Sequence, residues 1–248
     1  MTRGYCQRPW GDMAYRVRKS PDSRQPPLLL IHSSGCNSRH WDPVLPHLLG
    51  DLRLAACDLF GHGESSVGDG ITLDLMAEDL LALVDHLSME SPVLVGHSLG
   101  GMLALRIVGR WPQRVAGAAL IEGWTLLSGL KWEARKEMYG TLSNELIEST
   151  RKKSRDTYAR CPERVHESFW ETVKSADGSQ TLMATHLPVL EMYGDRGGPI
   201  PSREHLGVLE RSNVEMVWIE GAAQYSPTEA AQEVGVAISK WLETSVVL

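Results

Sequence analysis

The sequence has no excess of positive charge. Its 25 Lys and Arg residues are outnumbered by 31 Asp and Glu residues, for a net charge of -6, so no basic stripe is available to neutralise a phosphate backbone. We therefore expect no nucleic-acid partner. The four cysteines form no CxxC pair, which indicates reduced thiols and not a disulfide framework; they are Cys6, Cys36, Cys57 and Cys161.

Long apolar runs and linkers are also missing. The first ten residues, MTRGYCQRPW, contain no apolar signal core, and the longest aliphatic run, Leu80–Val84, is far too short to cross a bilayer. We therefore expect no membrane partner and a cytoplasmic location. No internal repeat, low-complexity tract or Gly/Ser linker divides the chain, so we expect a single domain over residues 1–248.

Apolar runs of strand length recur along the chain. Most are continuous and not alternating, which indicates strands covered on both faces. Helical periodicity fills most of the gaps, as in Leu73–Leu87. The pattern predicts the α/β class, with a mostly parallel, twisted sheet and helices on both faces. The predicted strands are Pro27–His32, Leu52–Cys57, Pro92–Gly96, Val115–Ile121, Pro188–Tyr193 and Val214–Ile219.

Two segments depart from this rhythm. Residues 125–185 are rich in Lys, Arg and Glu, with aromatic residues such as Trp132 and Tyr139 interleaved, and we interpret them as a helical lid insertion over the sheet. Near the C-terminus, Ser226–Glu229 (SPTE) combines an N-cap serine, a proline at the first helical position and a glutamate three residues on. This predicts one helix from there to about Glu243.

The motif with chemical consequences is Gly96–Gly101, which reads GHSLGG. It follows a predicted strand and precedes the helical segment Met102–Arg110, the setting that a G-x-S-x-G nucleophile elbow requires. A serine at the apex of such a strained turn needs neighbours without Cβ atoms, so substituting Gly96 or Gly100 should misplace Ser98. The helix N-terminus adds N–H groups and a positive dipole end, both suited to a developing oxyanion.

Two further loops accompany the elbow: His32–Gly35 (HSSG) after the first core strand, and Asp58–Ser65 (DLFGHGES) after the second. In this order and at these spacings, the three loops resemble the α/β-hydrolase superfamily over nearly the whole chain. The resemblance implies the α/β-hydrolase fold, with Ser98 as the catalytic nucleophile. It also implies an oxyanion hole formed by the backbone N–H groups of Ser34 and Leu99.

Three residues near this site are candidate substrate contacts. Ser33 stands where glycine is usual in the family, so its hydroxyl is placed to enter the pocket. His97 lies beside the nucleophile, with a packed structural neighbour as the alternative interpretation. Trp124 follows a strand end, where lining an apolar pocket and belonging to the ordinary core are both open.

The resemblance offers two positions for the acid of a Ser–acid–His triad. Most relatives place an aspartate in the loop that is here Gly194–Gly198 (GDRGG), but glycine occupies the usual acid position and Asp195 lies two residues early. Some members, including haloalkane dehalogenases, use the end of the preceding strand, where Glu122 stands. A carboxylate there needs a partner or a function to offset its desolvation. We therefore favour Glu122 over Asp195, with a solvated strand-end residue as the non-functional alternative.

The family places its catalytic histidine in the loop after the last core strand, and there this chain has Gln224. A glutamine amide cannot take a proton near neutral pH, so it cannot activate Ser98 as a general base. No histidine lies in this loop; the nine are His32, His40, His47, His62, His86, His97, His166, His186 and His205.

Gln224 leaves three interpretations open. We place first a serine hydrolase for an ester, lactone or similar acyl bond of a small apolar substrate, impaired by this one replacement. The second is a non-hydrolytic cyclase or lyase with Glu122 as base, and the third is a ligand-binding pseudo-hydrolase. The intact elbow and oxyanion sequences favour chemistry. No metal-ligand cluster, P-loop or dinucleotide fingerprint occurs, so we expect no metal, no cofactor and only a small-molecule partner; the sequence carries no signal for an oligomeric state.

Overall fold

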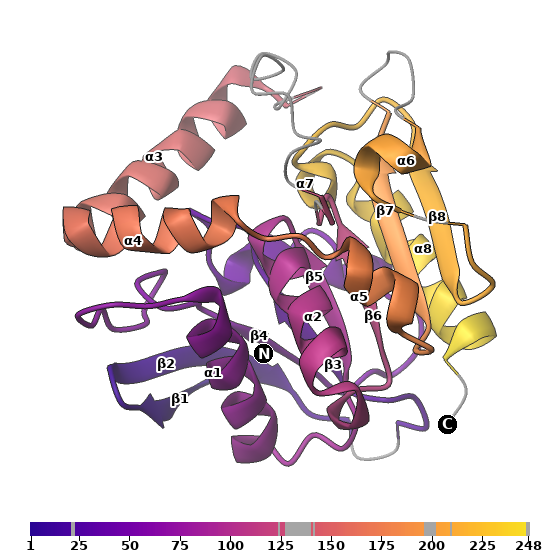
Figure 1. The fold of residues 1–248 in the computed structure, drawn as a ribbon, viewed down its shortest axis with the longest axis horizontal. Coiled ribbons are helices and arrows are strands. Elements are labelled where there is room, and N and C mark those ends of the chain that lie inside the picture. The colour runs from indigo at the N-terminus through magenta and orange to yellow at the C-terminus, as the bar shows by residue number, and fades with distance from the viewer. Residues whose placement is uncertain are drawn as a thin grey trace.

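The structure is a computed structural model that describes residues 1–20, 23–123, 125–126, 140, 142–195, 202–208 and 210–246. Within these residues, eight strands form one sheet in the order β1-β2-β4-β3-β5-β6-β7-β8 (Figure 1). The strands are β1 Thr2–Arg8, β2 Gly11–Arg18, β3 Leu28–Ile31, β4 Leu54–Cys57, β5 Val93–His97, β6 Gly117–Ile121, β7 Val189–Gly194 and β8 Val214–Ile219.

The six strands expected from the sequence are β3 to β8, and these six pair with one another in parallel fashion. Strand β1 pairs with β2, and β2 with β4, in antiparallel fashion. These two strands were missed because most residues of β1 remain exposed or half-buried, so no continuous apolar run marks it. The predicted mostly parallel sheet is confirmed, with an antiparallel hairpin added at one edge.

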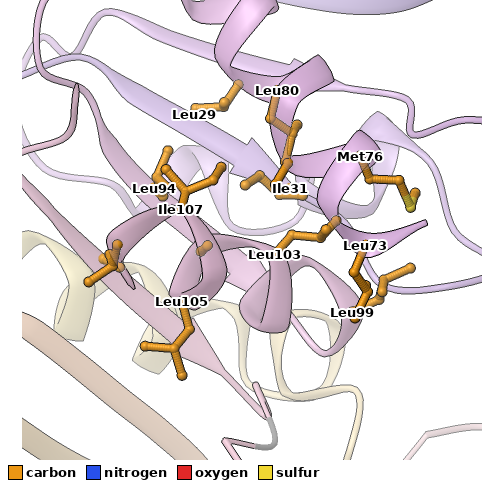
Figure 2. Close-up of a cluster of buried hydrophobic side chains, with 14 of the residues drawn as sticks. Leu29, Ile31, Leu73, Met76, Leu80, Leu94, Leu99, Leu103, Leu105 and Ile107 are labelled. Carbon is orange, nitrogen blue, oxygen red and sulfur yellow. The ribbon is translucent and has the colours of Figure 1, made fainter. Parts of the chain in front are cut away.

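Both faces of the sheet are covered. Along β3, Leu29 and Ile31 pack with helices α1 (Leu73–His86) and α2 (Leu99–Arg110), and Figure 2 shows this cluster. Leu28 and Leu30 face the other way, into the core that contains α8 (Ala231–Ser245). Alternate residues of one strand thus enter two cores, as continuous hydrophobicity predicts. Three short 3-10 helices complete this part of the chain: η1 Ser38–Trp41, η2 Leu45–His47 and η3 Pro112–Arg114.

The described part of residues 125–185 is helical. It leaves the sheet and returns to it at one place, since Gly178 N–H donates to Thr125 O (2.7 Å). Figure 1 shows α3 and α4 lying together, away from α8, and Arg160 of α3 donates to the carbonyl oxygens of Gly63 (2.5 Å) and Ser65 (2.7 Å). Trp132 and Tyr139 lie outside the described residues. The helices are α3 Asn144–Arg160, α4 Glu163–Lys174 and α5 Ser179–Ala184.

The C-terminal segment differs from its prediction. Instead of one helix there are two, α7 (Ser226–Glu229) and α8, separated by Ala230 (φ -135°, ψ 50°). Tyr225 and not Ser226 occupies the N-cap, and the buried Ser226 hydroxyl has no partner among the described residues. The capping box does not form because the Glu229 carboxylate binds other amides, those of the preceding loop. A further short helix, α6, spans Arg203–Leu206.

No helix among the described residues is both long enough and apolar enough to cross a membrane.

Candidate active site

Ser98 lies in the sharp turn between β5 and α2. Its backbone angles (φ 52°, ψ -113°) are ones that a residue with a side chain rarely adopts. Two backbone hydrogen bonds hold the turn: Ser98 N–H donates to Ile121 O (2.8 Å), and Met102 N–H donates to Ser98 O (3.0 Å). The strain is therefore maintained by the adjacent strand on one side and by the helix on the other.

The glycines around Ser98 sit where side chains would collide with backbone. A Cβ atom at Gly96 would lie 2.2 Å from the Gly100 carbonyl oxygen, and one at Gly100 would lie 2.1 Å from the carbonyl oxygen of Ile31. The second contact also shows that the start of α2, with Leu99, touches the end of β3. The two segments that carry the predicted oxyanion residues, Leu99 and Ser34, therefore lie side by side.

The turn after β3 is fixed by histidine side chains. His32 Nε2 accepts the N–H of Leu59 (3.0 Å), which leaves Nδ1 to donate to Ser33 O (2.7 Å). His62 Nε2 accepts the N–H of Gly35 (3.1 Å). Ser33 itself is buried. These bonds set the backbone direction on both sides of Ser34, the residue expected to donate its N–H to an oxyanion.

The Ser34 side chain faces the insertion. Its hydroxyl lies 2.8 Å from the hydroxyl of Tyr158 on α3, and burial raises the pKa of Tyr158, so this phenol stays protonated. The Tyr158 ring packs edge-on against His166, with ring centroids 4.7 Å apart. The turn that carries the predicted oxyanion donor is thus joined directly to the helical insertion.

A small pocket, with a cavity volume of about 30 Å³, opens beside this contact, between α3, α4 and the core. Its walls are mostly apolar, with the Ser34–Tyr158 hydroxyl pair among the few polar groups. This lining suits an apolar group, but the space is well below the volume of a typical ligand pocket. Its lining includes Ser34, Phe60, Ile71, Met76, Tyr158 and Phe169.

Glu122 follows β6 directly and is fully buried. Its backbone φ of 48° is left-handed, an uncommon state for glutamate that stores strain. The carboxylate accepts the N–H of Gly194 at 2.6 Å, and the Glu122 N–H donates to Met192 O (2.8 Å). A buried carboxylate held by a backbone donor at the end of the strand next to Ser98 is well suited to orient a base.

Asp195, the other candidate acid, has a different environment. It is half-buried, and its carboxylate accepts the N–H of Gly221 (2.8 Å), a residue with left-handed φ (69°) in the turn after β8. Its own N–H donates to Ile219 O (3.2 Å). These bonds tie the residue after β7 to the end of β8 and to the turn that follows it, which gives Asp195 a structural role whatever else it does.

Gln224 is 5% exposed and lies in a loop that is held from two sides. The amides that flank it, those of Ala223 and Tyr225, both donate to the Glu229 carboxylate, at 2.7 and 3.1 Å. Its own carbonyl oxygen lies 2.6 Å from His97 Nε2. The main chain around position 224 is therefore fixed by groups other than the glutamine side chain.

His97 is fully buried and stacks on His40, with ring centroids 4.7 Å apart and planes 10° apart. Burial lowers the pKa of His97 to about 4 and that of His40 well below its usual range, so both rings are neutral near pH 7. Because its Nε2 contacts the carbonyl of Gln224, this predicted substrate contact faces the core and the loop.

A second buried carboxyl lies close to Glu122. Glu191 on β7 is fully buried and accepts the hydroxyl hydrogen of Thr125 (2.8 Å). Burial, with a smaller contribution from the charge of Glu122, raises the pKa of Glu191 to about 8. At neutral pH Glu191 therefore stays mostly protonated.

The structure thus connects the predicted residues in pairs. Ser98 is bonded to the backbone of the strand that ends before Glu122, and His97 is bonded to Gln224. Trp124 lies outside the described residues. Sequence reasoning missed His40 and Tyr158, which reach the site from distant segments, and it assigned Glu229 to a helix cap and not to the loop at residue 224. In the described part of the chain, no group of three or more His, Cys, Asp or Glu side chains is arranged to hold a metal ion.

The family described as the alpha/beta hydrolase fold matches residues 26–184. The match spans more than half of the chain, and the fold and the Ser98 turn agree with it. The chain belongs to the alpha/beta hydrolase fold family, and it is an enzyme of this class.

Individual proteins are also similar to this chain. The chain is 43% identical over 99 residues to the dihydrolipoyllysine-residue acetyltransferase component of an acetoin cleaving system from Pseudomonas putida, a match that covers 38% of this chain and only 26% of that protein. It is 26% identical over 226 residues to a pimeloyl-acyl-carrier protein methyl ester esterase from Sodalis glossinidius, covering 81% of this chain and 86% of the relative.

Among solved structures, Est816, an N-acyl homoserine lactone degrading enzyme, superimposes with a TM-score of 0.77 at 19% identity, covering 96% of this chain and all of that one. At this identity the likeness shows the fold alone.

Proposed function

We propose that the chain is a serine hydrolase for an ester, lactone or similar acyl bond of a small apolar substrate, and that Gln224 impairs its hydrolytic step. The observation that carries the proposal is the strained turn at Ser98 (φ 52°, ψ -113°). Strain of this kind costs of order 1–3 kcal/mol, and a protein that only binds a ligand has little need of it. The esterase and lactone-degrading enzymes among the similar proteins support the same bond type.

In the competent form, a histidine at position 224 takes the proton from Ser98 Oγ as this oxygen attacks the acyl carbon. Glu122 orients that histidine and balances the charge it gains. The N–H groups of Ser34 and Leu99 stabilise the negative oxygen of the tetrahedral intermediate. The histidine then passes its proton to the leaving group, and it activates the water that releases the acyl chain from Ser98.

The apolar substrate is accommodated beneath the 125–185 insertion, which we propose acts as a lid on one α/β-hydrolase domain. The apolar pocket beside Ser34 and Tyr158 supports this assignment. Ser33 and Trp124 remain predicted substrate contacts. A small molecule is the only partner that the reaction requires, and a cytoplasmic location stays a prediction.

With Gln224 in place, the proton of Ser98 has no acceptor at position 224. Loss of a triad member costs on the order of 10⁴ to 10⁶ in turnover, while substrate binding and oxyanion stabilisation survive. We therefore expect the chain as it stands to bind its substrate and to turn it over slowly. The cyclase or lyase alternative, with Glu122 as base, requires no histidine, so a Gln224→His variant distinguishes it from the hydrolase.

The test compares the chain with its Gln224→His variant on a short-chain p-nitrophenyl ester. We expect a gain of about a hundredfold or more, well within the usual worth of a triad base, and its disappearance when Ser98→Ala is added. The matched control is Gln232→His, the same exchange at an exposed position of α8, which should give no gain. If Gln224→His gains nothing on this ester, on longer esters or on lactones, the hydrolase proposal fails and Glu122→Gln becomes the next variant.

A further inference from the structure

A pair of stacked imidazole rings lies directly under the loop that carries Gln224. His97 ends β5 and His40 comes from η1, a segment 57 positions earlier in the chain, yet their rings are nearly parallel at 4.7 Å. The Tyr225 ring meets His97 edge-on, with centroids 6.0 Å apart. His97 is fully buried, so the rings form a rigid contact between the nucleophile strand and this loop.

The hydrogen bond from His97 has a fixed direction. A carbonyl oxygen only accepts, so in the contact with Gln224 O (2.6 Å) the hydrogen must be on His97 Nε2. In the neutral ring, Nδ1 then carries no hydrogen, and it has no hydrogen-bond partner among the described residues. Burial keeps the ring neutral by lowering the pKa of His97 to about 4. The single N–H of His97 is thus committed to the main chain of residue 224.

This bond completes the hold on the loop. The Glu229 carboxylate accepts hydrogen bonds from the amides on either side, those of Ala223 and Tyr225. The N–H of His97 donates to the carbonyl oxygen of the residue between them. Because His97 directly precedes Ser98 in the chain, the strand that presents the nucleophile also fixes the backbone from which the side chain at 224 extends. A shift of either segment therefore has to move the other with it.

We propose that His97, supported by its stack on His40, is a positioning residue that sets the side chain at position 224 relative to Ser98. It neither contacts the reacting atoms nor transfers a proton. The inference rests on the proposed function, in which residue 224 is the position of the catalytic base. It replaces the expectation that His97 contacts substrate.

The test uses three substitutions of His97 in the Gln224→His chain. His97→Gln keeps an N–H near the position of Nε2, His97→Asn is too short to reach the carbonyl, and His97→Phe keeps a stacking ring without a donor. We expect kcat to fall about tenfold or more for the Asn and Phe variants with KM within about twofold, because a misplacement near 1 Å costs up to about a hundredfold. His97→Gln should stay within about threefold of its parent.

His86→Phe, the same exchange at a histidine that contacts Tyr15 far from this loop, is the control and should leave kcat unchanged. A kcat for His97→Phe and His97→Asn equal to that of the parent overturns the proposal. A fall in kcat for His97→Gln equal to that of the other two variants also overturns it, since kcat would then depend on the packing of the imidazole ring and not on its hydrogen bond. Should His97→Phe fail to fold, His97→Asn carries the comparison.

A second readout separates this inference from the proposed function, because it needs no activity. In the chain as it stands, hydrogen exchange of peptides covering residues 222–226 should speed up in His97→Phe and His97→Asn but not in His97→Gln. If Gln224→His shows no Ser98-dependent hydrolysis while exchange follows this pattern, the hydrolase proposal fails and the loop contact stands. Unchanged exchange in both loss variants overturns the role of His97 itself.

Discussion

Glu191 is a fully buried carboxyl group that the proposed reaction does not use, and its ionisation should make the stability of the chain depend on pH. The groups that face it are the Thr125 hydroxyl, the Tyr193 phenol and the carboxylate of Glu122, and burial is the main cause that raises its pKa from 4.5 to about 8. The perturbation is Glu191→Gln, which preserves the shape and an oxygen for Thr125 but cannot ionise.

The magnitude follows from the difference between the two pKa values. A folded-state pKa above the unfolded value means that the folded chain holds the proton more tightly, so this stabilisation is complete below about pH 4.5 and is lost as the pH rises through about 8. Between pH 7 and pH 9, the loss from this one group amounts to about 1.4 kcal/mol in the free energy of unfolding. Buried histidines contribute little in this window, because both their folded and unfolded forms are already neutral.

The assay is urea unfolding of the chain and of Glu191→Gln at pH 7 and pH 9. We expect the chain to lose about 1.4 kcal/mol more than the variant over this range. The comparison between the two proteins is needed because buried thiols such as Cys36, whose pKa burial raises to about 12, contribute in the same direction near pH 9. Glu215→Gln, at an exposed position of β8, is the control. Equal pH dependence in the chain and in Glu191→Gln would refute the reasoning.

Two further predictions concern acid and the elbow. Burial lowers the pKa values of His62 and His97 to about 3 and about 4, so the unfolded chain binds these protons at a higher pH than the folded chain does. Each group should therefore cost about 2 kcal/mol in the free energy of unfolding at pH 5 relative to pH 8. Urea unfolding in a Glu191→Gln background should show this loss, and adding His97→Gln should reduce it by about 2 kcal/mol; an unchanged loss would contradict the prediction. Gly100→Ala should lower the free energy of unfolding by about 3 kcal/mol or more and abolish the hydrolysis gained by Gln224→His, because its Cβ would lie 2.1 Å from the Ile31 carbonyl oxygen. The matched control is Gly70→Ala, whose Cβ would have nothing within 4 Å. Equal stability and activity of the two variants would count against the role of the glycine in the turn.

Local signals predicted much of the fold. Strands β3 to β7 are buried along their whole length and most of them read as continuous apolar runs, while the partly exposed β8 is still mostly apolar in sequence. The β1–β2 hairpin gives no such signal, since most of its residues are exposed or half-buried. The C-terminal prediction merged α7 and α8 into one helix because no sequence signal marks the break at Ala230.

The same limit applies to the site. Ser98 and Glu122 were predicted from residues adjacent in sequence: a glycine-flanked turn after a strand, and a carboxylate at a strand end. Tyr158 and His40 were not predicted, because each reaches the site only through tertiary packing and neither lies in a motif. Glu191 was missed for a further reason: one acidic residue in an apolar strand gives no indication of whether burial will raise its pKa far enough to keep it protonated.

The position of Gln224 in this network determines what its replacement can do. The hydrogen bonds from His97 and Glu229 reach this loop through the main-chain atoms of residues 223, 224 and 225, so exchanging the side chain of residue 224 leaves those bonds in place. The left-handed φ of Ser98 and of Glu122 is likewise held by backbone bonds to β6 and β7 that do not involve residue 224. Glutamine at this position therefore removes a proton acceptor without dismantling the scaffold that would present one. Under the proposed function, the deficit is confined to proton transfer, and a single substitution suffices to test it.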